Sequence, residues 1–182
     1  MSRLPDLRDE DMTADQKRVR DEIAAGPRGK VVGPLRVWLH SPGLAEHAQK
    51  LGAYARYHST LPPELSELAI LVTARHWRAA FEWSAHVGPA RAAGSPEAAI
   101  EAIRTGAEPA FEDAKSRAVY TVARKLHETR GLSDATYADA EAALGRQGLV
   151  DLVGILGYYT LVAMTLNAFA VPTPDGSRPF AG

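Results

Sequence analysis

Apolar residues recur every three to four positions along most of the chain, which is the spacing of amphipathic helices. No run of alternating apolar and polar positions rich in β-branched residues persists for five residues, so strands are not expected. Glycine and proline separate the periodic stretches. We therefore predict an all-α bundle of about six to eight helices, drawn from the periodic segments at about residues 13–25, 41–58, 64–77, 80–93, 96–104, 111–130, 134–144 and 149–170.

The length of the chain predicts one domain. A globular chain of 182 residues and 19.6 kDa buries roughly 70% of the surface that its unfolded form exposes, enough for a single core. We assign residues 1–182 to that domain. Thr13 and Gln16 have the spacing of a capping box and predict an N-terminal helix over about 13–25. Proline and glycine are interspersed in residues 172–182, which predicts an extended surface arm.

Two further segments are interpreted from their residue types. Residues 26–34 contain three glycines and two prolines, so we predict a loop that exposes Arg28 and Lys30. In the helix over 41–58 we expect the apolar stripe to face the core; it consists of Leu44, Ala48, Leu51 and Ala55.

Charge and hydropathy exclude several classes of partner. The 21 basic and 22 acidic residues give a net charge of -1, which provides no field for a nucleic acid. Polar residues, among them Asp151 and Asn167, interrupt the long apolar run over 149–171, so we interpret it as a buried helix and expect no membrane partner. No secretory signal is evident in residues 1–10, and we predict a cytoplasmic protein.

The sequence contains no cysteine. Disulfides, thiolate metal sites, cysteine nucleophiles and dithiol redox chemistry are therefore excluded.

Glu82 and His86 are the first candidates for chemistry. They are four residues apart on a predicted helix, so their side chains should be neighbours that can hydrogen-bond. A carboxylate beside an imidazole orients the ring, raises its basicity and forms a proton-transfer pair. Phe81 and Trp83 would give the pair an apolar setting. The alternative is an ordinary solvated Glu–His pair on a helix surface.

Glu67 lies on the preceding helix and offers a second carboxylate, unless it is a surface residue. With Glu82 and His86 it could form a three-ligand metal site. The chain lacks both H-E-x-x-H and the Glu-x-x-His spacing of helical di-iron sites, so we predict no metal.

These residues carry a family resemblance. Leu61-Pro62, Glu67-Leu68-Ala69-Ile70-Leu71 and Phe81-Glu82-Trp83 with His86 resemble the core of the carboxymuconolactone decarboxylase family, which is related to the alkylhydroperoxidase AhpD. The resemblance extends from about Val37 to Phe169. It implies an AhpD-like helical bundle, assembly into homotrimers or homohexamers, and an active-site pocket formed by Glu67, Glu82 and His86.

The chain departs from the peroxidase branch of this family in one respect. That branch uses a C-x-x-C pair, and the corresponding positions here are Ala79 and Glu82. Neither side chain can replace a thiolate in peroxide reduction. The resemblance then implies a cofactor-independent lyase of the kind found in aromatic degradation, which removes carbon dioxide from a small carboxylated lactone or related acid.

For that reaction we expect His86 to donate the proton, Glu82 to orient it or act as a second acid or base, and Glu67 to relay protons. Arg75 is the candidate for binding the substrate carboxylate. The other candidate substrate-binding residues are Phe81, Trp83, Tyr159 and Asn167. Two alternatives stay open: an isomerase or hydrolase that uses the same residues, and a non-catalytic oligomer that binds a small molecule.

Overall fold

The computed structural model describes residues 2–180, and within this range the secondary structure is entirely helical, as predicted. A short 3-10 helix, η1 (Asp9–Asp11), precedes the α-helices. These are α1 (Ala14–Ala25), α2 (Pro34–Trp38), α3 (Pro42–Tyr57), α4 (Pro63–His76), α5 (Ala80–Ala92), α6 (Glu97–Thr105), α7 (Ala114–Thr129) and α8 (Asp134–Ala168).

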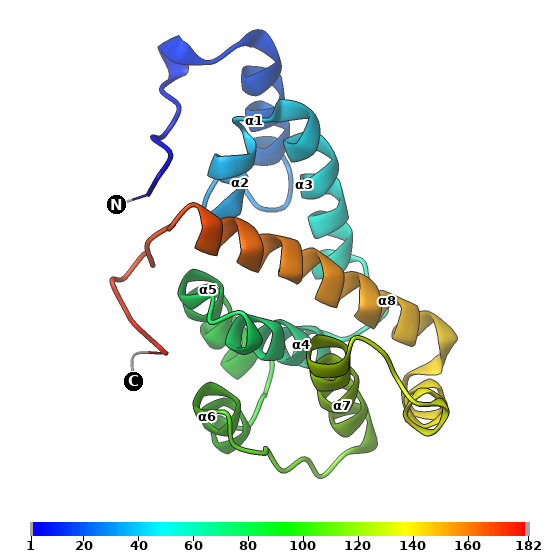
Figure 1. Ribbon diagram of the computed structural model, residues 1–182. Coiled ribbons are helices and arrows are strands. Elements are labelled where there is room, and N and C mark those ends of the chain that lie inside the picture. Colours follow the sequence, from blue (N-terminus) through cyan, green and yellow to red (C-terminus); the bar gives the residue numbers. More distant parts are fainter. Residues whose placement is uncertain (1, 181–182) are drawn as a thin grey trace.

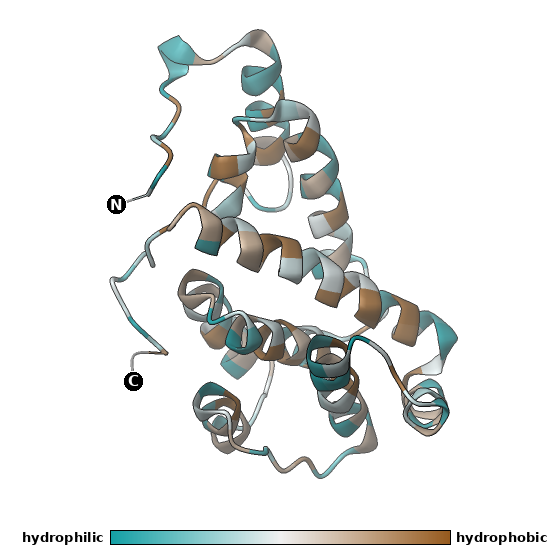
Figure 2. Ribbon diagram, viewed as in Figure 1, coloured by the Kyte–Doolittle hydropathy of each residue, from teal (hydrophilic) through white to brown (hydrophobic). Residues whose placement is uncertain are grey.

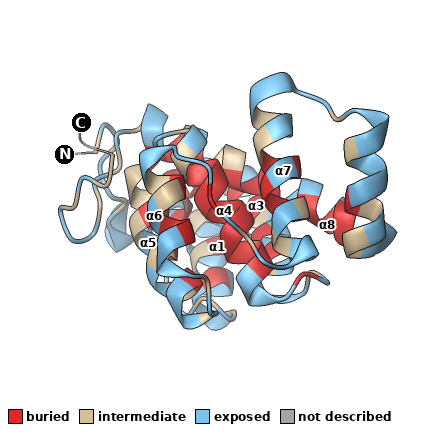
Figure 3. Ribbon diagram, turned by 90° about the horizontal axis from the view of Figure 1, so that it is seen from below, coloured by how far each residue is buried: buried red, intermediate tan, exposed pale blue. Residues whose placement is uncertain are grey.

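Helix α4 forms the centre of the molecule. Residues 65–74 are all buried, because α5, α7 and α8 pack around the helix on different sides. A helix that is apolar all round is stable only when it is enclosed in this way. Figure 3 shows the buried residues concentrated along α4 and its neighbours. Glu67 lies within this enclosed stretch, so the alternative of a surface glutamate is wrong.

Helix α8 runs across the molecule between two groups of helices. Helices α1 to α3 lie on one side and α4 to α7 on the other (Figure 1). Two separate helices were predicted over 134–144 and 149–170, and α8 does consist of two helical segments, which meet at a kink at Gly145, where φ is 72° and ψ is 166°. Apolar residues are concentrated along the second part of α8 (Figure 2).

Helix α8 is long and apolar enough to cross a membrane by length and composition alone. In its most apolar stretch, however, 61% of the residues are buried inside the protein. A core helix of a globular protein has the same properties, which agrees with the interpretation of this segment as a buried helix.

The N-terminal half confirms one prediction and corrects another. The capping box between Thr13 and Gln16 is present at the start of α1. On α3 the stripe facing the core is shifted from the predicted one: Ala45, Ala48, Gly52 and Ala55 are buried, whereas Leu44 and Leu51 are 45% and 48% exposed. Small residues face inward because α3 packs closely against α8, and the larger leucines face outward. Helix α2 and η1 were not predicted.

The C-terminal segment folds back over the ends of α5 and α6. Ser177 hydrogen-bonds to Ser84 on α5 (2.7 Å), Arg104 on α6 donates to the carbonyl of Pro179 (3.0 Å), and the ring of Phe180 packs on Trp83. The segment is thus held on the surface of the helices by specific contacts. Ala181 and Gly182, the last two residues of the predicted arm, lie outside the described residues.

Candidate active site

Glu67 and His86 form a buried pair between α4 and α5. The Nδ1 atom of His86 lies 2.7 Å from Oε2 of Glu67, and the two residues are 5% and 6% exposed. The ring of Tyr159 meets the imidazole edge-to-face, with 5.0 Å between centroids. Since the carboxylate engages Nδ1, it fixes the orientation of the ring and leaves Nε2 free.

The predicted hydrogen bond between Glu82 and His86 is wrong. The carboxylate partner of His86 is Glu67, 19 positions earlier in the chain. Helical spacing brings Glu82 and His86 to the same side of α5, but the side chain of Glu67 on α4 is the carboxylate that contacts the imidazole. Only the packing of α4 against α5 decides between these two partners.

The carboxyl group of Glu82 is buried without a partner. The residue is 1% exposed, and neither oxygen has a hydrogen-bond partner among residues 2–180. Glu82 lies in the first turn of α5, where the helix dipole favours a carboxylate, but this effect is at most about 2 kcal/mol. Removing a charged carboxylate from water costs several kcal/mol. Burial therefore raises the pKa of Glu82 well above its usual range, which favours the neutral acid.

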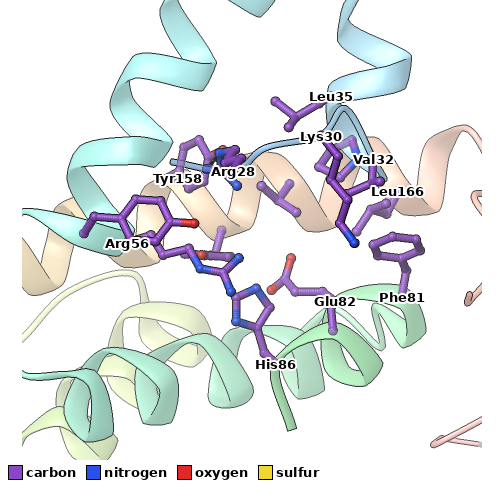
Figure 4. Close-up of a pocket in the computed structure, with 15 residues that line it drawn as sticks. Arg28, Lys30, Val32, Leu35, Arg56, Phe81, Glu82, His86, Tyr158 and Leu166 are labelled. Atoms are coloured by element: carbon purple, nitrogen blue, oxygen red, sulfur yellow. Dashed lines mark hydrogen bonds between the residues drawn. The ribbon is translucent and has the colours of Figure 1, made fainter. Parts of the chain in front are cut away.

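Glu82 and His86 line one cavity of about 210 Å³. Figure 4 shows both side chains directed into it from α5. The opposite wall comes from the loop before α2, from α3 and from α8. The lining residues are Arg28, Lys30, Val32, Pro34, Leu35, Arg56, Tyr57, Phe81, Glu82, Ala85, His86, Tyr158, Tyr159, Val162 and Leu166.

Two tyrosines of α8 close the inner end of the cavity. Tyr158 and Tyr159 are each 3% exposed, and their rings meet edge-to-face at 5.2 Å. Burial raises the pKa of both phenols, so they stay protonated and can donate a hydrogen bond to a ligand oxygen.

The predicted substrate-binding residues divide into two groups. Phe81 and Tyr159 line the cavity. Arg75, Trp83 and Asn167 do not, which corrects the prediction for all three.

Local geometry explains each of these corrections. Arg75 is in the last turn of α4, where its guanidinium lies over the ring of Phe180 at 5.6 Å. Trp83 follows Glu82 by one position, so it leaves α5 on another side and packs on the C-terminal arm. Asn167 donates a hydrogen bond to the carbonyl of Trp77 (2.7 Å) near the end of α8.

Sequence reasoning missed the basic residues of the cavity. Arg28 and Lys30 belong to the loop before α2, and Arg56 lies on α3. The loop was expected to expose both of its cations, but Arg28 is half-buried. No local pattern marks these residues, because they lie 26 to 58 positions away from the motif at Glu82 and His86.

Comparisons with known proteins show what the chain resembles. The profile of the carboxymuconolactone decarboxylase family matches residues 42–125, which include Glu67, Glu82 and His86. No curated protein sequence matches the chain.

Solved structures share the fold at low sequence identity. The debrominase Bmp8 in its apo form superposes with a TM-score of 0.72 at 12% identity, covering 96% of this chain and 92% of that one. An uncharacterized peroxidase-related protein with an alkylhydroperoxidase AhpD core, from Ralstonia eutropha JMP134, superposes with a TM-score of 0.77 at 15% identity. The match covers 98% of this chain and 94% of that one. A protein of unknown function from Agrobacterium tumefaciens superposes with a TM-score of 0.66 at 15% identity, and the match covers 79% of this chain and 99% of that one. The fold is thus AhpD-like, and residues 42–125 match the model of the carboxymuconolactone decarboxylase family.

Proposed function

We propose that this protein is a lyase that removes carbon dioxide from a small carboxylated lactone or a related acid by proton transfer. The observation that supports this most directly is the carboxyl group of Glu82, which has a raised pKa because it is buried without a partner among residues 2–180, and which lines the same cavity as His86, the partner of Glu67. A carboxylic acid that remains protonated near neutral pH is suited to deliver a proton to carbon.

The proposed reaction has two steps. The bond between the substrate carbon and its carboxylate breaks, carbon dioxide leaves, and the electron pair moves into the conjugated lactone as a dienolate. Glu82 then donates its proton to the carbon atom and becomes a carboxylate, which regains a proton from solvent. The roles thus differ from those inferred from sequence, because burial raises the pKa of Glu82 and so favours the protonated form that can donate to carbon.

Glu67 and His86 act on the developing charge. Glu67 accepts the hydrogen bond from Nδ1 and orients the imidazole, and when the ring also carries a proton on Nε2, that N–H can donate to the dienolate oxygen. The buried phenol of Tyr159 packs against the same ring and keeps it in place. A fixed donor of this kind commonly contributes about a hundredfold or more to turnover.

The first experiment measures carbon dioxide release from unsaturated lactone acids, with product identification by NMR in D₂O. We expect Glu82→Gln and His86→Gln each to lower turnover by about 10² to 10⁴-fold, since each removes a proton-transfer group. Glu64→Gln, at an exposed position in the first turn of the same helix as Glu67, is the control and should leave turnover unchanged.

The products separate this proposal from its alternatives. Ring opening without gas release would identify a hydrolase, and deuterium incorporation without loss of carbon would identify an isomerase. Turnover that survives Glu82→Gln would contradict the assigned proton donor.

A further inference from the structure

Helix α5 carries both Glu82 and His86, but its own sequence stabilises it poorly. Gly88 and Pro89 lie inside the helix, and proline has no N–H to donate to the preceding turn. No side chain caps its N-terminus, because the N-cap residue is Ala79. A helix of 13 residues with these features depends on tertiary contacts to stay formed. The position of Glu82, in the first turn, therefore depends on what packs against that turn.

The C-terminal arm, residues 172–180, packs on this part of α5. The chain turns back from the end of α8 and passes beside α5 (Figure 1). The ring of Phe180 meets the indole of Trp83 edge-to-face, with 5.3 Å between centroids, and the hydroxyl of Ser177 lies 2.7 Å from that of Ser84. Trp83 and Ser84 directly follow Glu82 in the chain, so both contacts act on the turn that carries the acid.

Three arginines hold the end of the arm in this position. Arg78, in the turn between α4 and α5, donates to the carbonyl of Phe180 (2.5 Å). Arg104 on α6 donates to the carbonyl of Pro179 (3.0 Å). The guanidinium of Arg75 on α4 lies over the ring of Phe180, at 5.6 Å from its centroid. The arm therefore ties the first turn of α5 to α4 and α6.

The turn between α4 and α5 is strained. Arg78 has a φ of 48°, in the left-handed region that a residue with a Cβ atom rarely adopts. Such a conformation persists only where surrounding contacts hold it. The hydrogen bond from Arg78 to the arm is one such contact, and the bond from Asn167 to the carbonyl of Trp77 is another. Since this turn sets how α5 leaves α4, the arm contributes to the geometry that brings His86 against Glu67.

We propose that the C-terminal arm positions Glu82 for the proposed reaction, with Phe180 as its main contact. By holding Trp83, the arm keeps the first turn of α5 packed in place and so keeps water away from the carboxyl group of Glu82. None of residues 172–180 lines the cavity, so Phe180 acts through Trp83 as a positioning residue. The inference rests on the proposed function for its effect on turnover, whereas the burial of Glu82 is measurable without a substrate.

Charge on the arm does not account for this effect. The charged and titratable groups that line the cavity with Glu82 come from the loop before α2, from α3, α5 and α8. They are Arg28, Lys30, Arg56, Tyr57, His86, Tyr158 and Tyr159. The carboxylate of Glu67 lies behind His86. Replacing Phe180 changes none of these groups, so a change in the pKa of Glu82 would report contact with water.

The test follows the carboxyl carbon of Glu82 by ¹³C NMR during a pH titration, with the signal assigned by comparison with Glu82→Gln. In the parent protein we expect a pKa well above the usual glutamate range, because the group is buried. In Phe180→Ala the first turn of α5 loosens, water reaches the carboxyl group, and its pKa should fall toward the usual range. Phe180→Tyr keeps the ring and should keep the titration of the parent.

Phe111→Ala is the matched control. The ring of Phe111 packs on Tyr120 of α7, with 5.6 Å between centroids, and it does not line the cavity. This variant loses the same aromatic group elsewhere and should leave the titration unchanged. Ser177→Ala removes only the hydrogen bond to Ser84, so it should shift the titration less and in the same direction. It decides the question if Phe180→Ala does not fold, which circular dichroism would show.

Turnover gives a second measurement, on a lactone acid that the parent protein decarboxylates. Phe180→Ala should lower kcat by about 10 to 10²-fold, change KM less, and move the basic limb of the pH profile to lower pH. A titration of Glu82 that is unchanged in the folded variants would overturn the positioning role, and so would a pKa within the usual range in the parent. If the NMR titration shifts but no lactone acid loses carbon dioxide, the positioning role stands and the proposed reaction fails.

Discussion

At the scale of a single residue, the buried carboxyl group of Glu82 opposes the stability of the folded protein. Its carboxyl group is desolvated and has no hydrogen-bond donor within residues 2–180. As the pH rises above the ordinary glutamate pKa, the unfolded chain releases a proton that the folded chain retains. The folded state is therefore progressively destabilised until the pH reaches the raised pKa of Glu82.

Replacing Glu82 by Gln should consequently stabilise the protein at neutral pH. We expect a gain of about 1.4 kcal/mol in the free energy of unfolding for each unit by which the folded pKa exceeds the unfolded one. The gain should diminish toward pH 4. Urea unfolding of both proteins at several pH values provides the measurement, and a variant less stable than the parent at pH 7 would contradict the assigned protonation state.

Asp151 offers an instructive contrast on α8. Burial acts to raise its pKa, but the backbone NH and hydroxyl of Thr60 and the hydroxyl of Tyr54 all donate to the carboxylate, at 2.7 to 2.8 Å. These hydrogen bonds outweigh desolvation and hold the pKa of Asp151 below its usual range. A polar residue that interrupts an apolar helix can thus be structural, whereas Glu82, without donors, is available for chemistry.

At the scale of the elements, a pair of histidines joins α4 to α7. The rings of His76 and His127 stack with 4.7 Å between centroids, and Nε2 of His127 lies 3.0 Å from Oγ1 of Thr73. The hydroxyl of Thr73 donates to the carbonyl of Ala69 (2.9 Å), so Nε2 of His127 must be the donor. Burial, and to a smaller extent the neighbouring His76, lower the pKa of His127 to about 4.

Protonation of His127 should weaken the contact between α4 and α7 at acidic pH. Between about pH 6.5 and 4 the unfolded chain binds a proton at His127 that the folded chain refuses, so stability is lost as the pH falls through this range. The loss amounts to at most about 3 kcal/mol, less where solvent screens the ring. We expect His127→Gln to flatten this part of the curve of unfolding free energy against pH. His47→Gln, at an exposed position on α3, should leave the curve unchanged.

A helix could be predicted from the sequence where residues close together in the chain determine where it begins and ends. The Thr13–Gln16 capping box needs only residues a few positions apart, and it was predicted correctly. Helix α2 is five residues long, begins after a glycine with φ of 58°, and has buried residues at Leu35, Val37 and Trp38. So short a helix is stable because tertiary contacts hold it, and periodicity over a long window cannot reveal it.

At the scale of the whole molecule, the outward-facing apolar residues of α3 bear on assembly. Leu44 and Leu51 lie seven positions apart, two helical turns, and are nearly half exposed. A homotrimer or homohexamer remains our proposal for the quaternary structure. Light scattering should then give three or six times 19.6 kDa.

A variant tests whether α3 contributes to that assembly. Leu44→Glu combined with Leu51→Glu places charge on the apolar stripe and should shift the mass toward the single chain. Tyr137→Glu, at a position on α8 that is 48% exposed, is the control and should leave the mass unchanged. An unchanged mass for the double variant would exclude α3 from the interface.

The sequence by itself determined the helical class, the absence of thiol chemistry and the three residues Glu67, Glu82 and His86 as candidates, because periodicity, composition and short motifs depend on positions close together in the chain. The tertiary structure decided which carboxylate pairs with His86, which carboxyl group is buried without a partner among residues 2–180 and which cations line the cavity. Those outcomes depend on desolvation and on contacts between α4, α5, α8 and the loop before α2. Such contacts join residues that are far apart in the chain, and no spacing rule describes them.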